Sequence, residues 1–122
     1  AGYSNGYFLA IRDSHFAFWV NGDMWHGYDT VYSTQTYNDG QWHHVAGVYD
    51  GSAQLGALYV DGALAASGTQ LYIDTSTASI RIGAVSAPEA ALNSLNGTLD
   101  DVRVYDRPLS TAEIRQIPEP AT

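Results

Sequence analysis

The sequence predicts an all-β protein built as an antiparallel sandwich. Asn-Gly or Asp-Gly pairs occur six times along the 122 residues, and short segments rich in Val, Ile, Tyr, Phe and Trp separate them. Such pairs readily supply the positive backbone angles that tight hairpins require. Many short strands at this spacing favour packed antiparallel sheets over alternating helices and strands. The pairs are Asn5-Gly6, Asn21-Gly22, Asp39-Gly40, Asp50-Gly51, Asp61-Gly62 and Asn96-Gly97.

The apolar segments between these turns are the predicted strands. They cover residues 7–12, 15–21, 28–33, 42–50, 55–61, 79–83 and 99–105. Side chains on a strand alternate between its two faces. In 42–50 both faces are largely apolar, which predicts a central strand that is covered on each side. In 99–105, Val102 and Val104 share a face with Asp100, while Asp101 points the other way.

One short helix is predicted after the last strand. Ser110 and Glu113 have the spacing of a capping box, in which each side chain binds the backbone amide of the other residue. Leu109 and Ile114 occupy the two positions of a hydrophobic staple. We therefore expect a helical turn over residues 111–116 that ends before the next proline.

The charge balance excludes several classes of partner. The chain has 13 acidic residues against five arginines and no lysine, and its formal net charge is −8. Without a basic surface, contact with nucleic acid or with an anionic membrane is not expected. No apolar run is long enough to span a bilayer, so no membrane insertion is expected within this chain. The absence of cysteine excludes disulfides and thiolate metal sites.

Five motifs follow one another in a specific order. They are residues 38–46 (NDGQWHHVA), 58–62 (LYVDG), 80–83 (IRIG), 95–105 (LNGTLDDVRVY) and 109–114 (LSTAEI). This series resembles the laminin-G-like domain of the concanavalin-A-like lectin/glucanase superfamily, over about residues 7–115. The resemblance implies an antiparallel jelly-roll sandwich that occupies residues 1–116.

The same resemblance bears on assembly. Family domains of this type begin with further strands, so it implies that early strands of the fold are missing from this chain or come from another copy. A sheet that lacks neighbouring strands exposes unpaired backbone groups. We therefore expect a homodimer that forms through a sheet edge.

Residues 117–122 are expected to form an extended, exposed tail, because two prolines block regular structure. The sequence Pro118-Glu119-Pro120 resembles the start of the bacterial PEP-CTERM sorting signal. That resemblance implies a bacterial protein that is secreted or held at the cell envelope or surface.

Catalysis is not expected from these residues. The superfamily includes retaining glycosidases, which need two carboxyl groups about 5 Å apart. Glu89, Glu113 and Glu119 fall in a loop, the terminal helix and the tail, and Asp100 and Asp101 point to opposite faces of one strand. Neither set forms a catalytic pair, so we expect a protein that is not an enzyme.

Asp100 is the candidate metal ligand. It shares a strand face with two valines, where a carboxylate must be paired, hydrogen-bonded or bound to a cation. Many members of the superfamily carry a structural calcium ion near this pair of aspartates, so the resemblance implies calcium at Asp100. His43 and His44 face opposite sides of a strand, so they are expected to be structural rather than to share one ion.

The candidate ligand-binding residues belong to an aromatic-rich stretch between residues 22 and 37. Aromatic rings stack on the apolar faces of sugars, while nearby amides and carboxylates bind sugar hydroxyls. The alternative is that most of these rings fill the core, as Tyr28 and Tyr32 would from one strand face. The candidates are Asp23, Trp25, His26, Tyr28 and Tyr37.

These patterns predict a noncatalytic extracellular or envelope-associated module that binds a carbohydrate or a cell-surface protein. Two alternatives remain open. One is a structural spacer or assembly domain without a ligand of its own, and the other is a fragment of a larger glycan-active enzyme.

Overall fold

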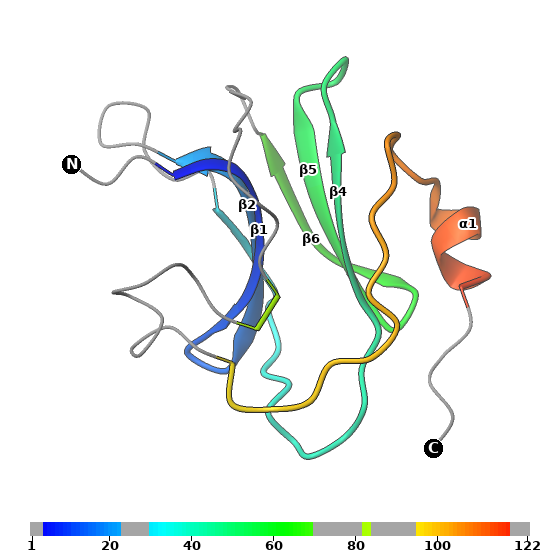
Figure 1. Cartoon of the computed structure of the whole chain (residues 1–122). Helices are drawn as coiled ribbons and strands as arrows, with labels where there is room; N and C mark the ends of the chain where they lie inside the picture. The colour runs from blue at the N-terminus through cyan, green and yellow to red at the C-terminus, as the bar shows by residue number, and fades with distance from the viewer. Residues whose placement is uncertain (1–3, 23–29, 70–81, 84–94, 118–122) are drawn as a thin grey trace.

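The protein folds into two three-stranded antiparallel sheets that face each other (Figure 1), as a computed structural model shows for residues 4–22, 30–69, 82–83 and 95–117. The first sheet has the order β1-β2-β3 and the second the order β4-β5-β6. The strands are β1 (Ser4–Arg12), β2 (His15–Gly22), β3 (Thr30–Tyr32), β4 (Val45–Asp50), β5 (Leu55–Val60) and β6 (Ala63–Thr69). The predicted all-β sandwich is confirmed.

Tight turns connect the neighbouring strands. The β5–β6 turn is formed by Asp61 and Gly62, whose φ angles are +53° and +81°. Asp-Gly was expected to form such a turn, because both central residues of this hairpin type need positive φ. The β1–β2 turn uses Asp13 and Ser14 instead, also at positive φ, and it pairs Arg12 with His15.

The core lies between the sheets, and β5 is its centre. Leu58 and Val60 of β5 are buried against Phe16, Phe18 and Val31 of the first sheet. The alternate residues of β5 point the other way, as the period of a strand requires. There they pack against the helix α1 (Thr111–Arg115), which Figure 1 places on the far side of the second sheet.

The helix is anchored to the outer face of this sheet. Ile114 is 1% exposed and packs against Ala57 and Tyr59 of β5. The Tyr59 hydroxyl lies 3.0 Å from Thr111 Oγ1. The predicted capping box is present, since Glu113 N donates to Ser110 Oγ and Ser110 N donates to Glu113 Oε1. The predicted terminal helix is therefore confirmed.

Several predicted strand limits were wrong. Residues 42–44 precede β4, because Asp61 Oδ1 accepts the hydrogen bond from His44 N that a ladder would use. Within the described sheet β4 lies at the end of the order, so β5 rather than 42–50 is the central strand. β6 was not predicted, because its Ala, Ser and Gly residues have weak strand propensity.

The segment 99–105 also differs from its prediction. It runs beside β4 in Figure 1 but is not a strand. Asp101 has φ +53°, which interrupts the extended backbone in the middle of the segment. Of the predicted strand 28–33, residues 30–32 form β3, while 28–29 lie outside the described residues, as do 79–81 of the predicted strand 79–83. In the part of the chain that the structure describes, no helix is long and apolar enough to cross a membrane.

Candidate functional site

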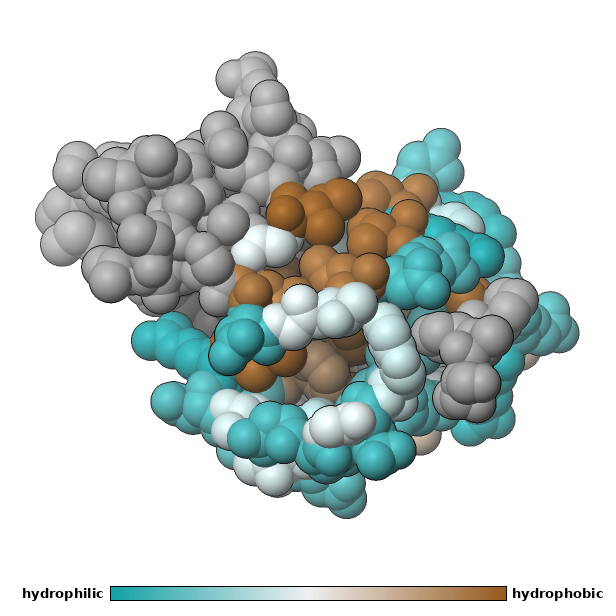
Figure 2. Space-filling model, turned by 60° about the horizontal axis from the view of Figure 1, so that its bottom comes forward, coloured by the Kyte–Doolittle hydropathy of each residue, from teal (hydrophilic) through white to brown (hydrophobic). Residues whose placement is uncertain are grey.

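A groove of about 1100 Å³ opens beside β4, between the first sheet and residues 95–109. Eight large apolar side chains line it and are 45–76% exposed. Figure 2 shows hydrophobic side chains gathered near the centre of one face of the molecule, with hydrophilic residues to the right of them and below. We call this groove, lined by the eight side chains, the apolar groove. The eight side chains are Leu9, Ile11, Trp42, Ile82, Leu99, Val102, Val104 and Tyr105.

The wall formed by residues 99–105 contains a local ion pair. Arg103 donates from Nε to Asp101 Oδ1 at 2.9 Å and from Nη2 to Oδ2 at 3.0 Å. This hydrogen-bonded pair lowers the pKa of Asp101. Asp101 has positive φ, and on the same wall Val102 and Val104 are 53% and 76% exposed.

A further part of the groove lining is the edge strand β4. Among the described residues, β4 forms its ladder with β5 alone, in a register that runs from Val45–Val60 to Asp50–Leu55. An edge strand presents backbone donors and acceptors that another strand can pair with. The apolar groove therefore combines exposed apolar side chains with a hydrogen-bonding backbone edge.

One end of the groove holds a histidine between two carboxylates. His43 Nδ1 lies 2.8 Å from Asp61 Oδ2, and His43 Nε2 lies 2.9 Å and 3.0 Å from the two oxygens of Asp39. The His43 side chain is 13% exposed. The hydrogen bond to Asp61, followed by that to Asp39, raises the pKa of His43, and burial opposes the rise. The pKa of Asp39 is lowered in turn, mainly by His43.

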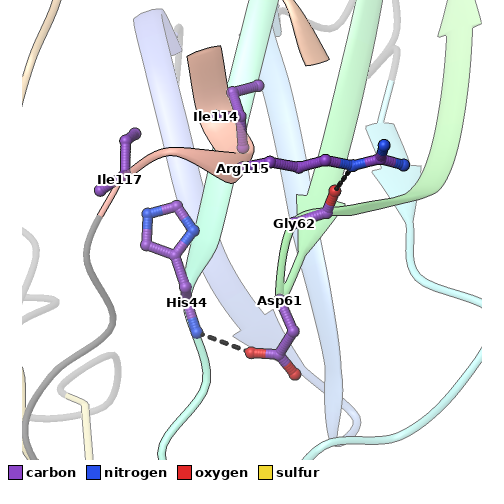
Figure 3. A pocket seen from close by; sticks show the side chains of 6 residues that line it. All are labelled: His44, Asp61, Gly62, Ile114, Arg115 and Ile117. Carbon is purple, nitrogen blue, oxygen red and sulfur yellow. Dashed lines mark hydrogen bonds between the residues drawn. The ribbon is translucent and has the colours of Figure 1, made fainter. Parts of the chain in front are cut away.

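A second, small pocket of about 80 Å³ lies between α1 and the β5–β6 turn (Figure 3). Arg115 Nε donates to Gly62 O at 3.1 Å, and His44 N donates to Asp61 Oδ1 at 2.9 Å, as the dashed lines show. Its volume suits a water molecule or two rather than an organic ligand. We therefore regard it as a packing gap beneath the helix.

The structure describes only one residue of the predicted ligand site, which stays a prediction. Asp23, Trp25, His26 and Tyr28 lie outside the described residues. Tyr37 is half-buried, and its ring centroid lies 5.1 Å from that of Phe16 and 5.1 Å from that of His43. Tyr37 therefore packs against the core while also lining the apolar groove.

The described side chains do not make a calcium site at Asp100. Asp100 is exposed, and its neighbour Asp101 is bound by Arg103. No three His, Asp or Glu side chains of the described residues could hold a metal together, whereas calcium takes six to eight oxygen ligands. Calcium at Asp100 stays a prediction from the resemblance. Calcium-dependent melting that persists in Asp100→Ala would contradict it.

The carboxyl groups weighed for catalysis are not brought together in the described residues. Glu113, on the helix, is bound by Arg107, which precedes the helix, and Glu89 and Glu119 lie outside the described ranges. His43 has both ring nitrogens occupied by carboxylates. A noncatalytic role stays a prediction.

Comparison with known proteins identifies the family of the chain. Residues 1–115 match the laminin-G-like family described as the concanavalin A-like lectin/glucanases superfamily. None of the curated proteins matches the chain. A crystal structure of an S-layer domain-containing protein from Clostridium thermocellum is similar in fold, with a TM-score of 0.56 and 22% sequence identity. The match covers 92% of this chain and 63% of that one. On the family match over nearly its whole length, the chain belongs to the concanavalin A-like lectin/glucanases superfamily.

Proposed function

We propose that this chain is a noncatalytic binding module of the bacterial cell surface or envelope, and that its apolar groove binds an extended segment of a partner polypeptide. The observation that carries the proposal is the exposed apolar lining of the groove beside the β4 edge. The family supports an extracellular binding or structural role. The fold neighbour, an S-layer domain-containing protein, supports a surface location.

The lining favours a polypeptide over a carbohydrate. Trp42 and Tyr105 are each 45% exposed and could stack on a sugar. The other six of the eight exposed large apolar side chains in the groove are aliphatic, among them Leu9 and Val104, and these offer nothing to sugar hydroxyls. An extended peptide can pair with the β4 edge through its backbone and place alternate side chains in the groove.

Charge favours a partner other than a second copy. The chain carries a net charge of −8, so two copies repel each other on approach. Asp100, Asp101 and Asp106 lie along the groove wall with Arg103 and Arg107. A neutral or basic segment with alternating apolar residues fits this groove best. The predicted homodimer is one outcome of the test below.

A structural spacer or assembly domain is the second candidate function. The likeness in fold to an S-layer domain-containing protein is the observation that favours it. A spacer needs no ligand, so it predicts that substitutions within the groove leave every binding measurement unchanged.

The test uses a twelve-residue peptide of alternating valine and lysine as the probe and one of alternating valine and glutamate as its charge control. Titration calorimetry should show binding of the basic peptide. Val104→Asn should weaken this binding at least about tenfold, a loss of roughly 1.4 kcal/mol, because it removes an apolar contact without adding charge. Leu64→Asn is the matched control, because Leu64 is 56% exposed on β6 and does not line the groove.

Three results would overturn the proposal. Binding on a glycan array without peptide binding would favour a carbohydrate ligand. A stable dimer in analytical ultracentrifugation that Val104→Asn dissociates would assign the groove to a second copy. Absence of any binding by the intact chain would favour the spacer.

A further inference from the structure

The contacts of His43 determine its protonation state. Each ring nitrogen faces an ionisable carboxylate, Asp61 on one side and Asp39 on the other. An ionised carboxylate accepts hydrogen bonds and cannot donate them, and a neutral imidazole carries only one N–H. Both contacts can be hydrogen bonds at the same time only if His43 is the doubly protonated cation.

The His43 side chain contacts three parts of the fold. Asp39 belongs to a turn closed by the bond from Gln41 N to Asp39 Oδ1 at 3.0 Å, with Gly40 at φ +74°. Asp61 belongs to the β5–β6 turn. On the first sheet, the Phe16 ring meets the His43 ring edge-on, with centroids 6.3 Å apart.

The turn next to His43 forms one end of the apolar groove. Gly40, Gln41 and Trp42 all line the groove, and Trp42 follows directly after the turn and precedes His43. The position of the Trp42 ring therefore depends on how firmly the turn is held.

We propose that protonated His43 is a clamp that holds the 39–42 turn at the end of the apolar groove, and that loss of one proton from His43 releases the turn and Trp42. The clamp would make the shape of the groove depend on pH. The inference concerns the free protein and holds whichever ligand the groove takes.

The contact with Asp39 is the one that opens. Asp61 is fixed twice more, because its Oδ1 accepts from His44 N and its own N donates to His44 O at 2.7 Å. The remaining proton therefore stays on Nδ1, facing Asp61. The lone pair of Nε2 then faces the Asp39 carboxylate, and the two repel each other.

The groups around His43 define the pH range. The titratable groups that the described residues bring to it are Asp39, Asp61 and Tyr37, while Phe16 is uncharged. The pKa of His43 is raised, so the clamp is complete below the ordinary histidine value of 6.5 and is lost as pH rises through the raised value. At the acid end, it is lost as pH falls through the lowered pKa of Asp39.

Nuclear magnetic resonance of the unliganded chain tests the clamp. At pH 6, nitrogen shifts of His43 should show protons on both ring nitrogens. As pH rises, the indole signal of Trp42 should move with the same midpoint as His43. Asp39→Asn should lower the midpoint of His43 by about one pH unit, because one of its two stabilising carboxylates is gone.

His44→Gln is the control, because the bond from residue 44 to Asp61 uses the backbone and remains. It should leave both midpoints in place. A neutral His43 at pH 6, or a Trp42 signal that does not follow His43, would overturn the clamp. Both measurements use the wild-type chain without ligand. The test of the clamp is therefore independent of whether the groove binds a peptide.

Discussion

The ring of Phe18 in β2 lies directly against the backbone of Gly47 in β4. A Cβ atom built on residue 47 would overlap the Phe18 ring at Cδ1 and Cε1. Phe18 is 4% exposed and belongs to the core between the sheets. At this point the two sheets approach so closely that there is no room for a side chain at residue 47 of β4.

Gly47→Ala should therefore destabilise the protein. The added methyl group forces the Phe18 ring or a whole sheet to move, and overpacking of this kind costs about 1–3 kcal/mol. Urea unfolding followed by circular dichroism measures the change in the free energy of unfolding.

Gly68→Ala is the matched control for that prediction. Gly68 is a strand glycine of the same sheet, in β6, but its Cβ would meet Val31 Cγ2 at 3.5 Å, an ordinary contact. Its effect should be clearly smaller. Equal losses in the two variants would show that Phe18 does not restrict residue 47.

The elements predicted correctly from the sequence are those fixed by local chemistry. Asp61-Gly62 forms its hairpin and Ser110 its capping box, because each depends on residues that are neighbours in the sequence. The errors arose in segments whose secondary structure is determined by tertiary contacts or by the backbone angle of a single residue. Asp101 at positive φ removed a strand that the alternation of residues 99–105 had indicated.

The candidate site was harder to predict for the same reason. Asp39 and His43 are four residues apart, but Asp61 joins them only through the β4–β5 register, in which Val45 pairs with Val60. A pairing of the strands deduced from the sequence could have placed Asp61 beside the two histidines. Trp42 was not predicted as a groove residue. The alternation of apolar residues in 42–50 does not show which face of the segment is left exposed in the fold.

Ile114→Ala should be among the most destabilising substitutions on the helix. Ile114 is 1% exposed and fills the space between α1 and the outer face of β5. Truncation of a buried isoleucine costs about 2–5 kcal/mol. Ile117→Ala, at a half-buried position just after the helix, is the control and should cost less. Similar losses in thermal unfolding would contradict the anchoring of the helix by Ile114.

Glu113 should make part of the stability depend on acid pH. Arg107 binds it through two contacts, at 3.0 Å and 2.6 Å, and Ser110 N donates to it as well. These interactions, with Arg107 as the largest cause, lower the pKa of Glu113 to about 2. Because the folded value is depressed, the contribution of Glu113 is present above its ordinary value of 4.5 and is lost as pH falls towards 2.

The carboxyl carbon shift of Glu113, followed by nuclear magnetic resonance between pH 6 and the lowest pH at which the chain stays folded, measures this directly. Arg107→Gln should return the pKa of Glu113 towards 4.5 and flatten the loss of stability in acid. Arg115→Gln removes a charge from the same helix, but Arg115 binds Gly62 O, so the titration should hardly change. An unperturbed midpoint in the wild type, or equal shifts in the two variants, would show that the Arg107 pair does not hold the carboxylate in solution.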